Sequence, residues 1–348
     1  MIYEDYKSLH QIPELGFKEF KTSTYVLKKL SLTRAKVNVI DTGICAFFDF
    51  KKRKTIAFRC ELDGLKIKED NNISFKSIHN GYMHACGHDG HMSILLSLSY
   101  YINNLKDFNY NILLIFQPSE EKYGGALSII PHLINYNIVG LFGMHFFPSL
   151  ENNEIYTSNN IIFSSSTEID IKTNANCTHI GNYSKNKDAI YLALKTVNEL
   201  QKNTKKHNLL FKYGFIKGGT SRNITASSCL IKGSIRGQNE TDTINFLNSI
   251  KTDKKIKIKA SPIIPPLIND YNLSLNLINN LKIKEIKKHF FQAEDFSFYG
   301  KYFPCVFFLQ GINSSELHTS SFLIEKENLI SGLNFYIRLL KYINISNI

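Results

Sequence analysis

Eight consecutive residues, His84 to His91, bring together three imidazoles, one thiol and one carboxylate, with two glycines among them. A thiolate at Cys86 and an imidazole at His88 can both reach one divalent cation, because sulfur and nitrogen are ligands that zinc and its first-row neighbours accept. The alternative is a histidine-rich loop without any ligand. The residue types and their spacing favour a metal site.

An acidic pair follows a predicted buried strand. Residues 112–116 form a continuous apolar run, and Glu120 and Glu121 stand just past its carboxyl end, where open α/β sheets bind their ligands. Two adjacent carboxylates near a core need a cation or hydrogen-bond donors. One could therefore hold a metal while its neighbour accepts a proton from water. The alternative is an exposed helix start, where the helix dipole favours glutamate.

Two further histidines follow strand-like apolar runs. His145 comes after residues 138–142, and His318 comes after residues 306–309. A single histidine near a strand end is more often structural than a metal ligand. Together with the octet from His84 to His91 and the acidic pair, however, these histidines complete a set of candidate metal ligands.

These residues give the chain a resemblance to the amidohydrolase branch of the dinuclear metallopeptidases, which includes aminoacylases, hippurate hydrolases and N-acetyldiaminopimelate deacetylases. The resemblance runs nearly end to end, with the family's order and spacing. It rests on residues 10–17, 59–65, 84–91, 117–121, 124–126, 144–145, 218–220 with Asn223, 294–296 and 317–318.

The resemblance implies two divalent metal ions per subunit, of zinc, manganese, cobalt or nickel. Their implied ligands are Cys86 as a bridging thiolate, His88, Glu121, His145 and His318. Glu120 is the implied general base, and Asp63 the acid that supports the cluster. Glu61 stands where relatives usually have aspartate, which keeps the charge and adds one methylene. A cysteine among histidines could also indicate a thiol nucleophile.

Helical and strand patterns predict two domains. Up to residue 162 the chain alternates helices (19–30, and one after His91) with strands (55–60, and one at Ile112), which indicates an α/β domain with a mainly parallel sheet. Strands at 167–172, 209–217, 229–236 and 254–259, with helices at 188–202 and 241–250, follow the order of a ferredoxin-like unit. We therefore predict a catalytic metal-binding domain of residues 1–162 and 263–348, with residues 163–262 inserted.

By resemblance, the inserted unit is a lid that also forms a homodimer. His179 matches the lid histidine that stabilises the oxyanion, often across the dimer, while Asn223 and Arg236 match residues that hold substrate. An arginine suits a carboxylate because its guanidinium binds in a bidentate way. The alternative for Arg236 is an ordinary surface ion pair.

Composition bounds the remaining possibilities. A length of 348 residues predicts about two compact units. No 18-residue apolar run and no signal-peptide pattern is present, and the six cysteines are scattered, so we expect a cytoplasmic protein with reduced thiols and no membrane partner. The net charge of +12 comes from dispersed lysines without an arginine cluster, which argues against nucleic acid as a partner.

The expected substrate is a small N-acyl amino acid. Residues 10–18 and 61–69 most resemble N-acetyldiaminopimelate deacetylase, which releases acetate in lysine biosynthesis. A broad aminoacylase or hippurate hydrolase and a metallodipeptidase are the alternatives of the same class. A ligand-binding homologue without turnover is the alternative from a different class.

Overall fold

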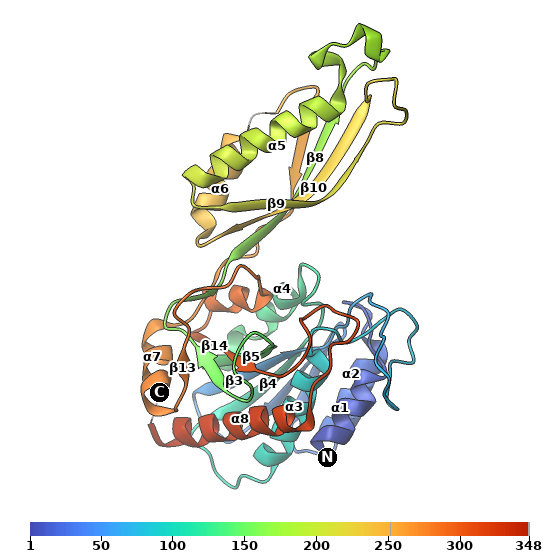
Figure 1. Cartoon of the computed structure of the whole chain (residues 1–348). Helices are drawn as coiled ribbons and strands as arrows, with labels where there is room; N and C mark the ends of the chain where they lie inside the picture. Colours follow the sequence, from blue (N-terminus) through green and yellow to red (C-terminus); the bar gives the residue numbers. More distant parts are fainter. Residues whose placement is uncertain (251, 347–348) are drawn as a thin grey trace. The chain divides into compact units, whose positions relative to one another are not determined.

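The computed structural model describes residues 1–250 and 252–346, and the chain divides into two compact units (Figure 1). The larger unit comprises Met1–Ile162, Ile268–Lys288 and the segment from Phe298 onward; the smaller unit comprises Phe163–Leu267 and His289–Ser297. The smaller unit extends past residue 262 because the backbone of Ile264 exchanges two hydrogen bonds, of 2.8 and 2.9 Å, with that of Ser166.

An eight-stranded sheet forms the centre of the larger unit, in the order β1-β2-β4-β3-β5-β14-β6-β13. Its four middle strands, β4, β3, β5 and β14, are parallel, so their carboxyl ends share one edge of the sheet. The strands are β1 (Lys36–Ile40), β2 (Gly43–Phe48), β3 (Thr55–Glu61), β4 (Asn111–Gln117), β5 (Ile138–Phe147), β6 (Ile155–Thr157), β13 (Lys284–Glu285) and β14 (Cys305–Gly311).

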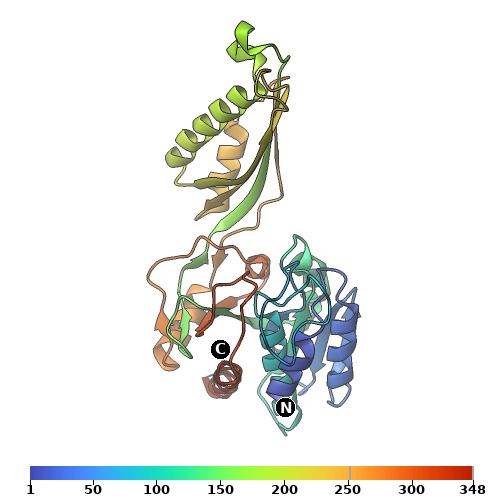
Figure 2. The same ribbon diagram turned by 45° about the vertical axis from the view of Figure 1, so that its right-hand side comes forward.

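Helices cover both faces of this sheet (Figures 1 and 2). They are α1 (Ile2–His10), α2 (Phe20–Leu30), α3 (His88–Asn103), α4 (Gly125–Ile129), α7 (Tyr271–Asn280) and α8 (Lys326–Ser346), with 3₁₀ turns η1 (Ile130–His132), η2 (Ile134–Tyr136) and η5 (Asp295–Lys301). The prediction of a helix after His91 is wrong in its start. The helix begins at His88, because Gly87 adopts a left-handed φ of 86° and turns the chain directly into α3.

The smaller unit has a four-stranded antiparallel sheet in the order β11-β8-β10-β9, with both of its long helices on one face (Figures 1 and 2). Its elements are β8 (Ser165–Asn174), η3 (Ile180–Asn182), η4 (Lys185–Lys187), α5 (Ala189–Lys206), β9 (Leu210–Gly218), β10 (Ser228–Gly237), α6 (Glu240–Ser249) and β11 (Ile256–Ala260). Where the chain passes between the units, β7 (Ile161–Phe163) pairs with β12 (Leu267–Ile268). The predicted fold class is confirmed.

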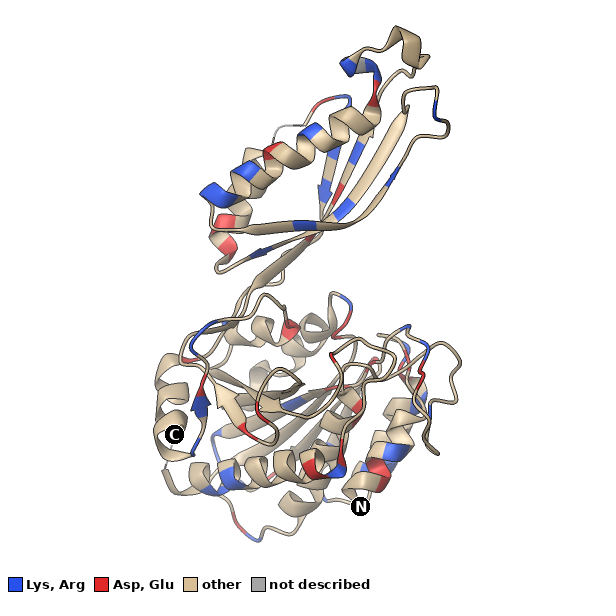
Figure 3. Ribbon diagram, in the orientation of Figure 1, with Lys and Arg blue, Asp and Glu red and all other residues tan. Residues whose placement is uncertain are grey.

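Charged residues are distributed along the ribbons of both units (Figure 3). In β11, Lys257 and Lys259 are exposed while Ile256 and Ile258 are half-buried, which is the alternation expected of a strand with one solvated face. Among the described residues, no helix is long and apolar enough to cross a membrane.

Candidate metal centre

Two candidate donors come from the turn into α3. Cys86 precedes Gly87, and His88 is the first residue of the helix. A Cβ added to Gly87 would lie 3.0 Å from the Phe146 ring, and a residue with a side chain would have to adopt a positive φ there, so the turn favours glycine where it packs against β5. The glycine therefore lets the thiol and the imidazole approach the same point beside β5.

The other donors come from the middle of the sheet and the loops beyond it. His145 lies within β5, which continues to Phe147 instead of ending at residue 142 as the apolar run suggested. Glu121 lies in the loop after β4, and His318 lies in the loop after β14. The His318 N–H donates a hydrogen bond of 2.8 Å to the Ala85 carbonyl, which fixes this distant loop beside the octet.

The five predicted ligands lie together in two groups that share Cys86. Its Sγ is 3.3 Å from Nε2 of His145 and 3.3 Å from Nε2 of His318. Nε2 of His318 is in turn 3.2 Å from Oε1 of Glu121. Potential ligand atoms of Cys86, His88 and His145 lie within 4.8 Å of one another, and so do those of Cys86, Glu121 and His318.

Hydrogen bonds orient two of the histidines as ligands. Nδ1 of His88 donates to the Asp63 carbonyl at 2.8 Å, and Nδ1 of His145 donates to the Phe146 carbonyl at 2.7 Å. Each Nε2 therefore faces the donor cluster, and Nε2 of His88 is buried without a hydrogen-bond partner among the described residues.

Burial alone would lower the pKa of His88, but the hydrogen bond to Asp63 and the charges of Glu61 and Glu121 raise it to about 10, so a metal bound at Nε2 would displace a proton. Burial and the neighbouring His91 lower the pKa of His145 to about 3, so its ring is neutral.

The thiol of Cys86 is also suited to bind a cation. Burial, together with Glu121 and Glu120, raises the pKa of Cys86 well above its usual value. The thiolate therefore needs a positive charge beside it, which a bound divalent metal would supply. A soft sulfur, three imidazoles and a carboxylate are a donor set that suits zinc and its first-row neighbours.

Asp63 accepts hydrogen bonds from the backbone of both glutamates of the acidic pair. Its Oδ1 accepts the N–H of Glu120 at 3.1 Å, and its Oδ2 accepts the N–H of Glu121 at 3.0 Å. The Glu120 side chain is 12% exposed, and its Oε2 is 3.9 Å from Nε2 of His88. Glu120 thus has a carboxylate at the rim of the donor cluster, within reach of a small substrate.

The last histidine of the octet supports the cluster without joining it. Nε2 of His91 accepts the Phe146 N–H at 3.1 Å, so its Nδ1 carries the proton and donates to Glu61 at 2.7 Å. Glu61 also pairs with the fully buried Arg59. These interactions, from Arg59 through Glu61 to His91, hold the backbone N–H of Phe146, the residue next to His145. Sequence reasoning missed Arg59, although a charge inside the apolar run of β3 was a usable signal.

The predicted lid residues all lie in the smaller unit, but not together. His179 is exposed and forms a β-bridge with Ile224, and Asn223 lies beside this bridge. Arg236 stands eight residues along β10 from Ser228, about 26 Å away at ~3.3 Å per residue. It forms an ion pair of 3.8 Å with Glu168. His179 and Arg236 are therefore at opposite ends of the sheet within one copy.

Comparison with known proteins identifies the family. Residues 57–342 match the sequence profile of Peptidase family M20/M25/M40. The chain belongs to this family. As an M20 hydrolase it acts on peptide or amide bonds and depends on bound metal, which agrees with the donor cluster.

Relatives of this M20 hydrolase extend over nearly its whole length. An uncharacterized hydrolase of Staphylococcus epidermidis is 30% identical over 368 residues, covering 96% of each chain. A dinuclear metal-binding M20 peptidase of Bacillus subtilis, YXEP, superposes with a TM-score of 0.81 at 23% identity, covering 99% of this chain and 98% of that one. An aminobenzoyl-glutamate utilization protein of Klebsiella pneumoniae has a TM-score of 0.72 at 15% identity, with coverages of 99% and 96%.

A buried ionic network adjoins the start of α3 in the M20 hydrolase. Nδ1 of His10 is 2.6 Å from Asp89, and its Nε2 is 3.1 Å from Glu69. Burial alone would lower the pKa of His10, but the hydrogen bonds to the two carboxylates outweigh it and raise that pKa to about 9. The network joins α1 to α3 through charges that water cannot screen.

We expect this network to make stability depend on pH. Because the folded pKa of His10 is above its unfolded value of 6.5, the protonated ring stabilises the fold below pH 6.5, and this contribution is lost as pH rises through 9. The shift corresponds to about 3 kcal/mol. The H10N variant should therefore unfold more easily than wild type at pH 6.5, and the difference should shrink by pH 10. Denaturant unfolding across this range measures it.

The exposed His132 provides a control, since H132N should show no pH-dependent difference from wild type. A stability difference for H10N that stays constant from pH 6.5 to pH 10 would contradict a protonated His10.

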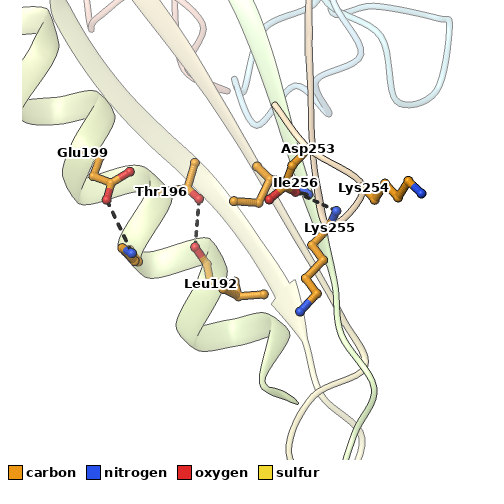
Figure 4. A pocket seen from close by; sticks show the side chains of 8 residues that line it. Leu192, Thr196, Glu199, Asp253, Lys254, Lys255 and Ile256 are labelled. Atoms are coloured by element: carbon orange, nitrogen blue, oxygen red, sulfur yellow. Dashed lines mark hydrogen bonds and ion pairs between the residues drawn. The ribbon is translucent and has the colours of Figure 1, made fainter. Parts of the chain in front are cut away.

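The smaller unit also contains a cavity, which lacks a donor cluster like the one described above. It has a volume of about 480 Å³ and lies between α5 and the segment before β11 (Figure 4). It is lined by Leu192, Lys195, Thr196, Glu199, Asp253, Lys254, Lys255 and Ile256. Asp253 accepts the N–H groups of Lys255 and Ile256 at 2.7 Å, and Glu199 pairs with Lys195 at 3.9 Å. Its lining contains no imidazole or thiol and none of the predicted site residues.

Proposed function

We propose that this M20 hydrolase removes the acyl group from N-acyl amino acids, with N-acetyldiaminopimelate as the leading substrate, acetate as a product and lysine biosynthesis as the context. The observation that carries the proposal is the sharing of Cys86 by two donor groups, with Glu120 beside them. This arrangement fits two cations next to one general base. The choice of the acyl and amino acid parts rests on the sequence resemblance.

Each residue of the cluster has a defined chemical task in this proposal. Two divalent cations held by the five donors would polarise the amide carbonyl and lower the pKa of the attacking water. Glu120 accepts the water's proton and passes it to the departing amine. No acyl-enzyme is needed, so the buried Cys86 serves as a ligand and not as a nucleophile.

His179 is suited to stabilise the oxyanion. Its Nδ1 accepts the Gly181 N–H at 3.1 Å, so the proton is on Nε2. That N–H belongs to an exposed side chain and is available to donate to a developing negative charge. Arg236 would bind the substrate carboxylate through its guanidinium, with Asn223 as a further polar contact.

A second copy of the chain is the partner that the smaller unit fits. Both edge strands of its sheet, β11 and β9, expose two lysines, so lysines alone do not favour pairing at either edge. The β9 edge also exposes Tyr213, Phe215 and Ile216, which are 40%, 44% and 49% accessible. Pairing of β9 with β9 of another copy would cover these side chains and the open backbone of the edge strand.

A broad aminoacylase or hippurate hydrolase is the first alternative within the family, and a metallodipeptidase is the second. The name of the Klebsiella relative favours an acylated amino acid, because aminobenzoyl-glutamate is an amino acid acylated on its nitrogen. A binding protein without turnover is the alternative of another class, and the presence of Glu120 with all five donors argues against it.

A substrate panel tests the proposal. The purified protein is loaded with zinc, manganese, cobalt or nickel and assayed on N-acetyl, N-succinyl and N-benzoyl amino acids, N-acetyldiaminopimelate and dipeptides. We expect metal-dependent release of acid from the N-acyl compounds, and loss of that activity after chelation. Hydrolysis of dipeptides alone would favour the peptidase, and metal binding without any turnover would favour the binding protein.

A further inference from the structure

The segment around His10 to Lys18 marks the family resemblance, yet none of the catalytic tasks above uses it. In the structure this segment packs against the loop that carries Glu120. A Cβ added to Gly16 would lie 2.4 Å from Oγ and 2.9 Å from Cα of Ser119, the residue before Glu120. The chain can therefore approach this loop so closely only because position 16 is glycine.

Ser119 has a backbone conformation that serine rarely adopts. Its φ is 53°, in the left-handed region, and its side chain is fully buried. On the opposite side, a Cβ added to Gly125 would lie 2.1 Å from the Pro118 carbonyl oxygen and 2.5 Å from that of Ser119. Two glycines thus enclose a strained residue, and strain of this kind persists only where surrounding contacts impose it.

Three consecutive N–H groups of the loop donate to buried carboxylates. Ser119 donates to Oε1 of Glu19 at 2.8 Å, while Glu120 and Glu121 donate to Asp63. The other oxygen of Glu19 accepts the Thr42 hydroxyl at 2.6 Å, and Glu19 has no exposed surface. Glu19 is therefore the contact that holds the strained residue from the N-terminal side.

We propose that Glu19 is a positioning residue for the general base: it holds Ser119 in the left-handed conformation and thereby aims Glu120 at the substrate. This inference rests on the proposed role of Glu120. Without Glu19, the buried N–H of Ser119 loses its acceptor, and the loop can relax toward an ordinary φ. Asp63 would still hold the N–H groups of Glu120 and Glu121, so metal binding should survive, while the relaxed backbone at Ser119 turns the base away from the substrate.

Glu14 provides a matched control in the same segment. Its carboxylate accepts the N–H groups of Lys21 and Thr22, at 2.8 and 2.9 Å. It therefore caps α2 and does not hold the loop of residues 119–121. A loss of general stability should appear in both E14A and E19A. A loss of base positioning should appear in E19A alone.

The experiment compares E19A, E19Q and E14A on the best N-acyl amino acid of the panel. We expect E19A to lower kcat by about 10- to 100-fold, the effect of a small misplacement, with KM and metal content little changed. E19Q keeps an oxygen acceptor and should restore most of kcat. Hydrogen–deuterium exchange of residues 119–121 should be faster in E19A than in wild type or E14A, and this readout does not depend on activity.

A second substitution tests the strain directly. Glycine adopts a positive φ without cost, so S119G in the E19A background should recover part of the lost kcat. Unchanged kcat and exchange in folded E19A, or equal effects of E19A and E14A, would overturn the inference. A failure of the proposed function is distinguishable, because wild type itself would then not hydrolyse the N-acyl amino acids, whereas a failure of this inference leaves wild type active and E19A equal to it.

Discussion

The E120Q variant should keep its fold and its bound metal but lose kcat by about 10²- to 10⁴-fold. The glutamine amide has nearly the shape of the carboxylate, and the N–H groups that Asp63 accepts belong to the backbone, so the loop should stay in place. The amide cannot accept the proton of the attacking water, however. Steady-state kinetics with elemental analysis of the same preparations measures both quantities.

A matched control is available on α8, where Glu327 is exposed and is not one of the candidate donors. E327Q should have wild-type kcat and metal content. If E120Q turned over substrate at a rate near that of wild type, another residue would have to act as the base. If E120Q lost its metal, Glu120 would be a ligand rather than a base.

The position of the donors could be predicted from sequence because parallel strands impose it. Apolar runs before Glu120 and near His145 and His318 indicated buried strands, and the carboxyl ends of parallel strands share one edge. The octet needed no such argument, since Cys86 and His88 are only two residues apart. Local pattern and sheet geometry thus indicated which residues could meet, and the family resemblance implied which of them are ligands.

The sequence could not show which of several similar side chains performs which task. His84, His88 and His91 have the same chemistry, and all three lie within five residues of Cys86. Their tasks differ because of partners far away in sequence: a carbonyl of Asp63 orients His88, and Glu61 holds His91. His84 has no hydrogen-bond partner among the described residues, and burial lowers its pKa to about 4, so it stays neutral.

Glu19 was missed for a related reason. In sequence it is the first residue of the predicted helix 19–30, where acidic residues are common because of the helix dipole. Its actual partner, the N–H of Ser119, is 100 residues away. Only the positive φ of Ser119 shows that the contact holds a strained loop, and φ cannot be derived from a serine in a Pro-Ser-Glu-Glu sequence.

The smaller unit raises a geometric question that its own sheet helps to answer. An N-acyl amino acid is about two residues long, which is roughly 7 Å when extended. His179 and Arg236 of one copy are separated by most of the length of β10, so a single substrate cannot contact both. If both residues act on one substrate, they must come from different copies of the chain.

Mixing two inactive variants tests this arrangement. H179A should lose kcat by about 10²- to 10³-fold through the missing oxyanion donor. R236A should lose about 2–5 kcal/mol of substrate binding if its contact with the carboxylate is desolvated. In a two-fold symmetric dimer, a mixed pair would contain one site with both residues intact and one with neither. Random mixing should then restore about one quarter of wild-type activity.

The comparison decides between shared and separate sites because the alternatives predict different activities. Were both residues to act within one copy, every site in the mixture would lack one of them, and activity would stay at the level of the single variants. K232A is the matched control: Lys232 is exposed on the same strand, where it pairs with Asp170 at 3.7 Å, and its loss should leave activity unchanged. Recovery in the H179A and R236A mixture requires pairing of copies, and β9 is the edge that offers it. Charged substitutions at Phe215 and Ile216 should therefore abolish the recovery while the metal centre stays loaded.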